Sequence, residues 1–353
     1  MFFTYLLIAV LLVVAELLYF RIADRFNIVD KPNARSSHTK VVLRGGGVIF
    51  PISMVVWLIL GMVHGFDGSS VQGYIPFIVG LLLISCVSFW DDVRSLPDSV
   101  RLMAHFSAMA LMFWSMGIMH WDMWWFVIVA LIVCVGATNI INFMDGINGI
   151  TAGYALAVLV PLALVNGFGV QGVQEVQVGQ GVQGFIEPSY LVVAIIGVLV
   201  FCLFNFRPKG KAKCFAGDVG SISIAFILLF ALGKLIVRTN DLTYLIFLII
   251  YGVDGCLTIV HRIMLHENLG EAHRKHAYQL MCNELKIGHV KISILYMVLQ
   301  LAVSLGFIYL CPDTLTAHWI YFVTAVLVLI AAYIVFMKKY YHLHEEYLES
   351  LKS

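Results

Sequence analysis

Long apolar runs separated by short polar segments dominate the sequence. Each run is close to the roughly 20 residues that a helix needs to cross the hydrocarbon of a bilayer. The runs are 2–20, 46–63, 74–90, 102–119, 123–139, 149–166, 190–205, 219–236, 242–262, 292–311 and 317–337. They predict an all-α, polytopic integral membrane protein with about eleven transmembrane helices in a single domain over 1–353.

The basic residues predict the orientation of these helices. Of the 22 Lys and Arg residues, all but Lys234 and Arg238 lie in every second loop, at the edge of one (Arg262), or in the segment 338–353. Cytoplasmic loops carry an excess of Lys and Arg, so these loops and the tail at 338–353 are predicted to be cytoplasmic. No Lys or Arg precedes the first run, whereas Arg21 and Arg25 follow it directly. The first run is therefore predicted to be a span with its N-terminus outside, rather than a signal peptide.

One predicted external loop, 167–189, contains a Gly/Val/Gln repeat. This composition is too polar and too rich in glycine to pack well, which predicts a flexible linker.

The composition agrees with a membrane protein and excludes several other classes. Hydrophobic residues make up 61% of the chain and charged residues 12%, about half the ~25% of an ordinary soluble domain. The formal net charge is +1. These values argue against a soluble enzyme, a disordered scaffold and a protein recruited to nucleic acid by charge. The seven cysteines include no Cys-x-x-Cys pair, so neither a disulfide framework nor a cysteine zinc site is expected.

Polar chemistry is concentrated in the predicted cytoplasmic loops. In the third loop, Asp91 and Asp92 end an apolar run, where the helix dipole disfavours anions. A metal ion or a neighbouring arginine should offset their charge. A functional pair is favoured over a solvated helix end with Arg94 and Arg101 as partners, because ionisable groups at membrane depth are usually functional.

The fifth loop has no Lys or Arg, although it is predicted to be cytoplasmic. Asn139, Asn142, Asp145 and Asn148 lie there beside two glycines. Amide and carboxylate groups suit a pocket for a polar ligand or an oxygen-ligand site for Mg²⁺. Helix capping would explain Asp145 or Asn148 alone but not the whole cluster.

The seventh loop has four basic residues within 207–213, followed by a Gly-Asp-Val-Gly-Ser turn at 217–221 that contains Asp218. Free amides at a helix N-terminus bind phosphate, and glycines let a ligand approach the backbone. A simple helix cap together with a topology signal explains this stretch equally well.

Two further loops are rich in basic residues and histidine. In the ninth loop, His273 and His276 would share one helix face beside Arg274. No His-Glu-x-x-His motif is present, so a phosphate-binding face is favoured over zinc. The first loop places Arg35, His38, Lys40 and Arg44 before three glycines. Basic residues are expected where a chain enters the membrane, and this explains most of that pattern.

Together, these loops predict an anionic centre surrounded by cationic side chains. The acidic residues are Asp91, Asp92, Asp145 and Asp218. This composition is typical of Mg²⁺-dependent handling of a diphosphate at a membrane surface.

Five motifs in order resemble the polyprenyl-phosphate N-acetylhexosamine-1-phosphate transferases (glycosyltransferase family 4). They are Arg35 to Gly47, the Asp-Asp pair with Leu96, Pro97 and Arg101, Asn142 to Gly149, Gly217 to Ser221, and His273 to His276. The resemblance implies transfer of a sugar-1-phosphate from a UDP-N-acetylhexosamine, such as UDP-GlcNAc, to undecaprenyl phosphate, with release of UMP. It also implies a bacterial cytoplasmic membrane, an active site facing the cytoplasm, a Mg²⁺ cofactor with Mn²⁺ as an alternative, and a homodimer as a candidate assembly. No nucleic-acid partner is implied.

The resemblance implies roles for particular residues. Asp218, Asp91 and Asp145 would hold the metal ion, and one aspartate of the pair at 91–92 has been considered a base in such enzymes. The residues implied in substrate binding are Arg35, His38, Lys40, Arg44, Arg101, Asn142, Asn148, His273, Arg274 and His276.

Departures from the peptidoglycan branch narrow the expected substrate. That branch has a run of consecutive histidines and the segment Thr-Pro-Thr-Met-Gly-Gly. In place of that segment, this chain has Val-Leu-Arg-Gly-Gly-Gly at 42–47. The initiating step of O-antigen or another surface glycan is therefore favoured over phospho-MurNAc-pentapeptide transfer. Two rival classes are a secondary transporter and an intramembrane aspartyl protease.

Overall fold

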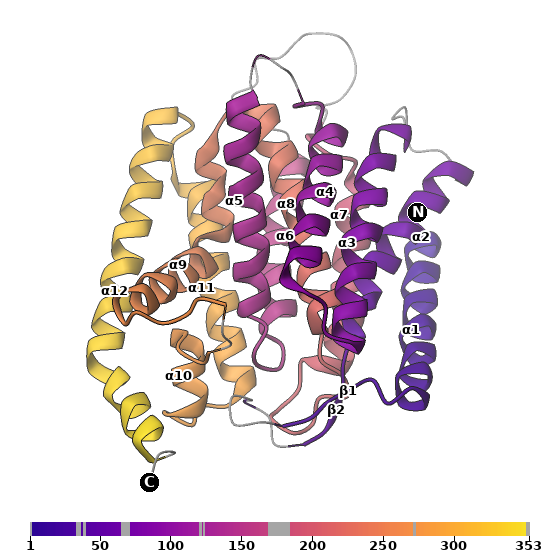
Figure 1. Cartoon of the computed structure of the whole chain (residues 1–353). Coiled ribbons are helices and arrows are strands. Elements are labelled where there is room, and N and C mark those ends of the chain that lie inside the picture. The colour runs from indigo at the N-terminus through magenta and orange to yellow at the C-terminus, as the bar shows by residue number, and fades with distance from the viewer. Residues whose placement is uncertain are drawn as a thin grey trace.

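The computed structural model describes residues 2–32, 37, 40–64, 71–119, 122, 124–168, 184–270 and 273–350. These residues form twelve α-helices, most of which run side by side in one bundle (Figure 1). The helices are α1 (Phe2–Arg25), α2 (Ile49–His64), α3 (Ile75–Val93), α4 (Asp98–Met116), α5 (Trp124–Phe143), α6 (Ile150–Phe168), α7 (Pro188–Asn205), α8 (Gly217–Thr239), α9 (Ile249–Met264), α10 (Ala277–Asn283), α11 (His289–Leu310) and α12 (Leu315–Ser350).

Each predicted apolar run corresponds to a helix of the bundle. Ten helical segments in the described part of the chain are long and apolar enough to cross a membrane. The helix α4 is not among them, because Asp98, Arg101 and His105 occupy its first turns, yet it packs along α3. The prediction of an all-α, polytopic membrane protein is confirmed.

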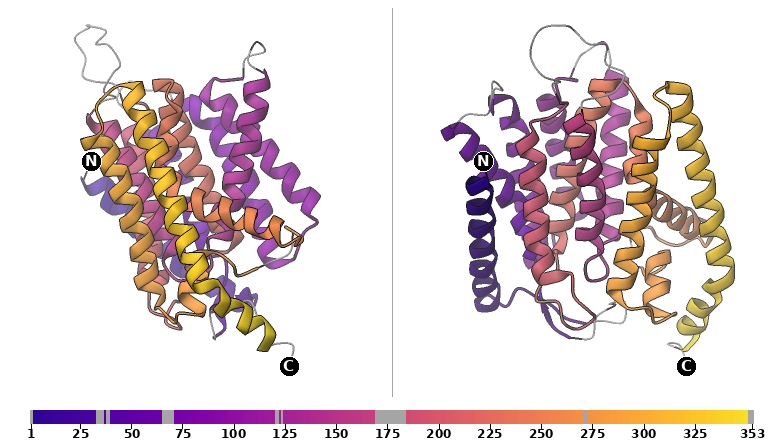
Figure 2. Two further views of the ribbon diagram at one scale, coloured as in Figure 1. Left: turned by 90° about the vertical axis from the view of Figure 1, so that its left-hand side faces the viewer. Right: turned by 180° about the vertical axis from the view of Figure 1, so that it is seen from behind.

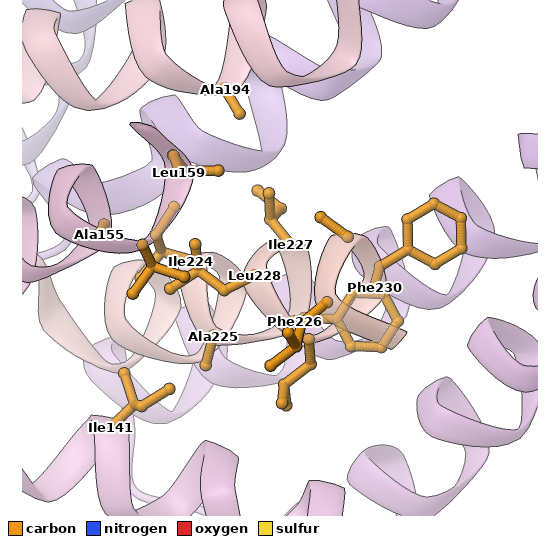
Figure 3. Packing of buried hydrophobic residues seen from close by; sticks show 14 of the residues in the cluster. Ile141, Ala155, Leu159, Ala194, Ile224, Ala225, Phe226, Ile227, Leu228 and Phe230 are labelled. Carbon is orange, nitrogen blue, oxygen red and sulfur yellow. The ribbon is translucent and has the colours of Figure 1, made fainter. Parts of the chain in front are cut away.

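The helix α8 forms the centre of the bundle. It packs against α2, α3, α4, α5 and α6, and its apolar side chains are buried over most of their surface. Figure 3 shows Ile224, Phe226 and Phe230 of α8 among residues of neighbouring helices. Close packing of side chains, rather than exclusion from water, holds such helices together in lipid. The N-terminus of α8 is therefore a fixed point on which a site can be built.

The predicted span 242–262 differs from a single straight helix. It begins as a 3₁₀ helix, η4 (Leu242–Leu248), and continues as α9, which runs across the bundle rather than along it (Figures 1 and 2). The polar residues Asp254, Thr258 and Arg262 recur every four positions and are buried. The opposite face is apolar and exposed at Val260, Ile263 and Met264. This inverted amphipathic pattern explains why α9 turns its polar side inward.

One end of the bundle carries most of the non-helical structure. The strands β1 (Val29–Asp30) and β2 (Val42–Leu43) pair antiparallel with Asp30 opposite Val42. They lie at the same end as the α5–α6 turn, α10 and the C-terminus, the lower end in Figure 1. The loops that sequence analysis groups together are therefore brought to one end. The side of the membrane that this end faces stays a prediction.

The structure differs from the sequence prediction at the ends of two segments, the loop 167–189 and the tail 338–353. Residues 169–183 of the predicted external loop lie outside the described residues, but Phe185 and Ile186 are buried and Ile186 exchanges two hydrogen bonds with Asn166. At the C-terminal end, α12 continues as one helix from Leu315 to Ser350. Neither glycine nor proline interrupts 338–350, so the predicted tail extends the last span without a break.

Candidate active site

Asp92 joins three parts of the chain. Its Oδ1 accepts the backbone N–H of Asp218 at 2.9 Å, and its Oδ2 accepts that of Val219 at 2.9 Å. The Nε of Arg44 lies 2.6 Å from Oδ1. Asp92 therefore caps the N-terminus of α8 from another helix and fixes Arg44 beside it. Its side chain is fully buried, at 0% exposure, and these three donors use most of its hydrogen-bonding capacity.

Asp91 has different partners. It accepts the backbone N–H of Leu96 at 2.6 Å and binds Arg101 at 3.1 Å. It also lies within hydrogen-bonding reach of the Asp218 side chain. Two carboxylates this close repel each other unless a cation or a proton lies between them. The Nη2 of Arg44 is 3.7 Å from Asp218, so one positive charge already faces the pair.

Backbone contacts between the first and seventh loops bring Arg44 to this place. Leu43 forms a parallel bridge with Cys214, and its carbonyl accepts the N–H of Phe215 at 2.8 Å. Tyr19 of α1 donates to the Arg44 carbonyl at 2.5 Å. Burial alone would lower the pKa of Arg44, but the charges of Asp92 and Asp218 raise it above its ordinary value. Arg44 is therefore a permanent cation beside the acidic pair.

Two glycines make this approach feasible. A Cβ on Gly47 would lie well inside van der Waals contact with the Cα of Gly220 in α8. Gly217 has φ +70°, and a Cβ there would lie 2.5 Å from Asp92 Oδ2. Larger residues at these positions would separate the first loop from the N-terminus of α8.

The fifth loop lies against the same helix N-terminus. The Ser221 hydroxyl donates to Asn142 Oδ1 at 2.7 Å, and the Thr151 hydroxyl donates to Asp145 at 2.5 Å. Burial raises the pKa of Asp145 to about 6, although the hydrogen bond from Thr151 lowers it. Burial therefore disfavours the charged form of Asp145.

Asn148 ties the fifth loop to two other segments. Its amide donates to the Arg207 carbonyl at 2.8 Å, and its backbone N–H donates to His289 Nδ1 at 3.2 Å. Next to it, the N–H of Gly149 donates to Asn205 Oδ1 at 2.7 Å. These contacts hold the loop open around a cavity.

The cavity has a volume of about 250 Å³. The site residues predicted from the sequence that line it are Arg44, Asn142, Asp145, Asn148 and Asp218. Sequence analysis assigned no role to four further lining residues, which are Asn205, Phe215, Gln279 and His289. Asn205 and His289 are the last residue of α7 and the first of α11. In the sequence, each of the two is a polar residue at the edge of an apolar run, and this is the feature that could have identified them as site residues.

The histidine segment (residues 273–276) lies behind the fifth loop. Asp254 Oδ1 is 3.3 Å from His276 Nδ1 and accepts the N–H of Ala277 at 3.1 Å. The Tyr296 hydroxyl donates to Asp254 Oδ2 at 2.6 Å. Asp254 thus orients His276 and caps α10. Sequence analysis assigned no role to Asp254.

The two histidines carry buried ring nitrogens, His273 Nδ1 and His276 Nε2, that have no hydrogen-bond partner among the described residues. The His273 ring packs edge-on against Phe143 of the fifth loop, with centroids 6.0 Å apart. Burial, followed by the neighbouring His276, lowers the pKa of His273 to about 3. At neutral pH His273 can offer a ligand a hydrogen bond but no positive charge.

Several known proteins are similar in sequence to this chain. The sequence model for glycosyl transferase family 4 matches residues 74–235, which run from α3 to α8. A probable undecaprenyl-phosphate N-acetylglucosaminyl 1-phosphate transferase of Bacillus subtilis is 24% identical over 274 residues, or 73% of this chain and 70% of that protein. A decaprenyl-phosphate N-acetylglucosaminephosphotransferase of Mycobacterium leprae is 24% identical over 300 residues, or 76% and 72%. The chain is therefore similar to glycosyl transferase family 4 over residues 74–235.

A third relative matches a shorter part of the chain. A phospho-N-acetylmuramoyl-pentapeptide-transferase of Moorella thermoacetica is 31% identical over 136 residues, or 38% of this chain and 36% of that protein. The resemblance seen in the sequence is therefore confirmed at the level of the family.

Three further site residues predicted from the sequence are not among those that line the cavity. Arg101 binds Asp91 and Asp98. Lys40 is exposed, and Arg274 is directed toward α12. Arg35 and His38 lie outside the described residues, so their predicted roles stay predictions.

Proposed function

We propose that this protein transfers a sugar-1-phosphate from a UDP-N-acetylhexosamine to undecaprenyl phosphate and releases UMP. The observation that carries the proposal is the meeting of Asp91, Asp218 and Arg44 at the N-terminus of α8, at the edge of the cavity. A helix N-terminus with an adjacent arginine suits phosphate. The carboxylates suit a divalent cation that accompanies a diphosphate.

The reaction needs one bond to form and one to break. An oxygen of the lipid phosphate attacks the sugar-linked phosphorus of the donor. The bond from that phosphorus to the bridging oxygen breaks, and UMP leaves with the electron pair. A phosphate monoester has its second pKa near ~6 and is already largely dianionic at neutral pH. Orientation and electrostatics should therefore contribute more than proton removal.

Individual residues would divide this work. Arg44 would neutralise phosphate charge from a position that Asp92 fixes. Asn142, Asn148 and Asp145 would hydrogen-bond the nucleotide side of the donor in the cavity. The bonding pattern of Asp92 favours a positioning role over that of a base.

The donor set fits Mg²⁺. Asp91 and Asp218 lie within reach of each other, and Mg²⁺ is commonly bound by one or two carboxylates together with substrate phosphates and water. Within the described ranges, no three His, Cys, Asp or Glu side chains form a complete metal site. Asp91 and Asp218 would hold the ion, with Asp145, which lines the same cavity as Asp218, as a third carboxylate. When bound, Mg²⁺ would neutralise the diphosphate and the departing UMP.

The proposed sugar rests on two observations, the similarity to the relatives and the sequence of the first loop at 42–47. The two N-acetylglucosamine-1-phosphate transferases align over about two thirds or more of both chains, whereas the muramoyl-pentapeptide transferase aligns over 36% of its length. Together with Val-Leu-Arg-Gly-Gly-Gly at 42–47, this favours UDP-GlcNAc or a close derivative. We propose surface-glycan initiation in the bacterial cytoplasmic membrane, with the site facing the cytoplasm.

The test is substrate-dependent release of UMP. Purified protein in detergent would receive undecaprenyl phosphate and, in separate reactions, UDP-GlcNAc, UDP-GalNAc or UDP-MurNAc-pentapeptide. We expect UMP and a lipid-linked sugar with a UDP-N-acetylhexosamine, and loss of both products on chelation of Mg²⁺. Product with the muramoyl donor alone would move the protein to the peptidoglycan branch. No UMP with any donor would contradict the proposed function and leave the transporter class open.

A further inference from the structure

Arg274 does not face the cavity, although the sequence predicts it to bind substrate. Its Nη2 lies 2.8 Å from Glu284 Oε1, and its guanidinium stacks on the ring of Tyr347 with 3.9 Å to the centroid. The side chain is 12% exposed. Arg274 is therefore held between the end of α10 and the last turns of α12.

Glu284 is the common acceptor of this network. It also receives His344 Nδ1 at 3.0 Å, and both of these side chains are almost fully buried. Burial alone would raise the pKa of Glu284, but the hydrogen bonds from His344 and Arg274 hold it below its ordinary value. The contact is thus a buried, charge-assisted hydrogen bond rather than a surface pair.

The helix α12 also contacts α9 above this point. The hydroxyls of Tyr333 and Thr258 are 3.0 Å apart, and the rings of Tyr341 and His261 are 4.5 Å apart. The lower part of α12 passes beside α10 in Figure 1. It follows one side of α9 and ends on the histidine segment.

The histidine segment connects Arg274 to the cavity. Arg274 lies between His273 and His276 in the chain, and the N–H of His276 donates to Gln279, which lines the cavity. The Tyr278 hydroxyl donates to the Phe143 carbonyl at 3.1 Å. A shift of Arg274 would therefore move both histidines relative to the fifth loop.

We propose that the C-terminal end of α12 positions the histidine segment for donor binding, with Tyr347 and His344 acting through Arg274 and Glu284. This inference rests on the proposed function, since the donor is the UDP-sugar named there. Arg274 is then a positioning residue rather than a phosphate ligand. The fold brings this support from the far end of the sequence, beyond the residues 74–235 that the family model matches.

The experiment compares Tyr347→Ala with two matched variants. Tyr347→Phe keeps the ring that stacks on Arg274. Tyr340→Ala removes a tyrosine of the same helix whose described ring contacts are with Phe336 and Lys339 of α12 itself. We expect Tyr347→Ala to raise KM for the UDP-sugar about tenfold, as loss of a partly buried cation–π contact would. The kcat and the KM for undecaprenyl phosphate should stay within about twofold, and both control variants should behave like the unmodified protein.

Combination with Arg274→Ala separates a positioning residue from a ligand. If the tail acts through Arg274, the double variant should lose no more than Arg274→Ala alone, because Arg274→Ala already removes the contact with Tyr347. Additive effects of the two substitutions would show that Tyr347 does not act through Arg274 and would overturn the inference. Tyr347→Ala kinetics equal to those of Tyr340→Ala would overturn it as well.

A second readout does not depend on turnover. Hydrogen exchange in detergent should accelerate at 277–283 in Tyr347→Ala and stay unchanged in Tyr340→Ala. Unchanged exchange in both variants would contradict a positioning role. If the unmodified protein itself releases no UMP, the proposed function fails, and the exchange result still decides whether the tail holds this segment.

Discussion

The acidic cluster and the histidine segment are held by different kinds of contact. Around Arg44, Asp92 and Asp218, backbone groups of the first loop pair with the seventh loop, and a helix N-terminus is capped by Asp92. The histidine segment depends instead on side chains from α9, α11 and α12. Backbone contacts therefore fix the positions of the charged groups in the acidic cluster. The position of the histidine segment depends on single side chains.

This difference indicates where substitutions should matter most. A lost carboxylate in the acidic cluster leaves buried cationic and N–H groups without an acceptor, which is costly. At the histidine segment, the contact between Tyr347 and Arg274 can be lost while Arg274 keeps its ion pair with Glu284, so this loss leaves no buried charge unpaired. The effects expected below decrease in that order.

Replacing Asp218 should give the largest loss. Asp218→Asn removes a carboxylate that faces both Asp91 and Arg44. We expect UMP release to fall by about 10³-fold, in the range for loss of a group that stabilises transition-state charge, and the Mg²⁺ concentration for half-maximal rate to rise. The matched control is Asp98→Asn, which alters a carboxylate that is 86% exposed. A loss within tenfold would remove Asp218 from the proposed centre.

Replacing Asp92 tests whether that cluster works by position or by proton transfer. Asp92→Asn keeps the shape but loses the charge that faces Arg44. We expect a loss of about 10²-fold that is uniform from pH 6 to 9, with a similar loss in Arg44→Gln and little addition in the double variant. The measurement is the pH profile of UMP release. A deficit that shrinks as pH rises would show that Asp92 is a base.

Replacing Asp254 measures the other side of the comparison. Asp254→Asn weakens the orientation of His276, while the single amide oxygen can still accept the N–H of Ala277 and the NH2 group can donate to the Tyr296 hydroxyl oxygen. We expect about a tenfold rise in KM for the UDP-sugar, as for loss of one charge-assisted hydrogen bond. Asp313→Asn, on a carboxylate that is 42% exposed, is the control. An effect as large as that of Asp218→Asn would erase the distinction between the two regions.

The sequence predicts the acidic cluster better than the histidine segment. The acidic residues lie at helix ends, whereas the histidine segment depends on side chains from several other helices. Spacing and apolar runs place Asp91, Asp92, Asp145 and Asp218 at helix ends, and the bundle then brings those ends together. Hydropathy does not encode tilt, so the crosswise course of α9 was missed, although its four-residue polar period was visible.

The orientation of Arg274 was beyond sequence reasoning. It depends on Glu284 and on Tyr347, and nothing local favours that pairing over a phosphate. The same holds for Asn205 and His289, whose side chains reach the cavity only because α7 and α11 end beside the fifth loop. Local pattern predicts which residues are polar at a helix end, whereas tertiary packing decides where they point.

The smallest expected effect concerns protonation of the histidine segment. The pKa of His273 is lowered to about 3 by burial, whereas an unfolded histidine titrates near ~6.5. As pH falls below 6.5, protons bind the unfolded chain preferentially, so the stabilisation present above 6.5 is lost progressively toward pH 3. We expect the melting temperature in detergent to fall by about 2 °C more between pH 7.5 and 5.5 in the unmodified protein than in His273→Gln. His342→Gln, at an exposed position of α12, should retain the full dependence. An equal fall in all three proteins would show that His273 titrates as it does in the unfolded chain, and the segment would then offer the donor a charge after all.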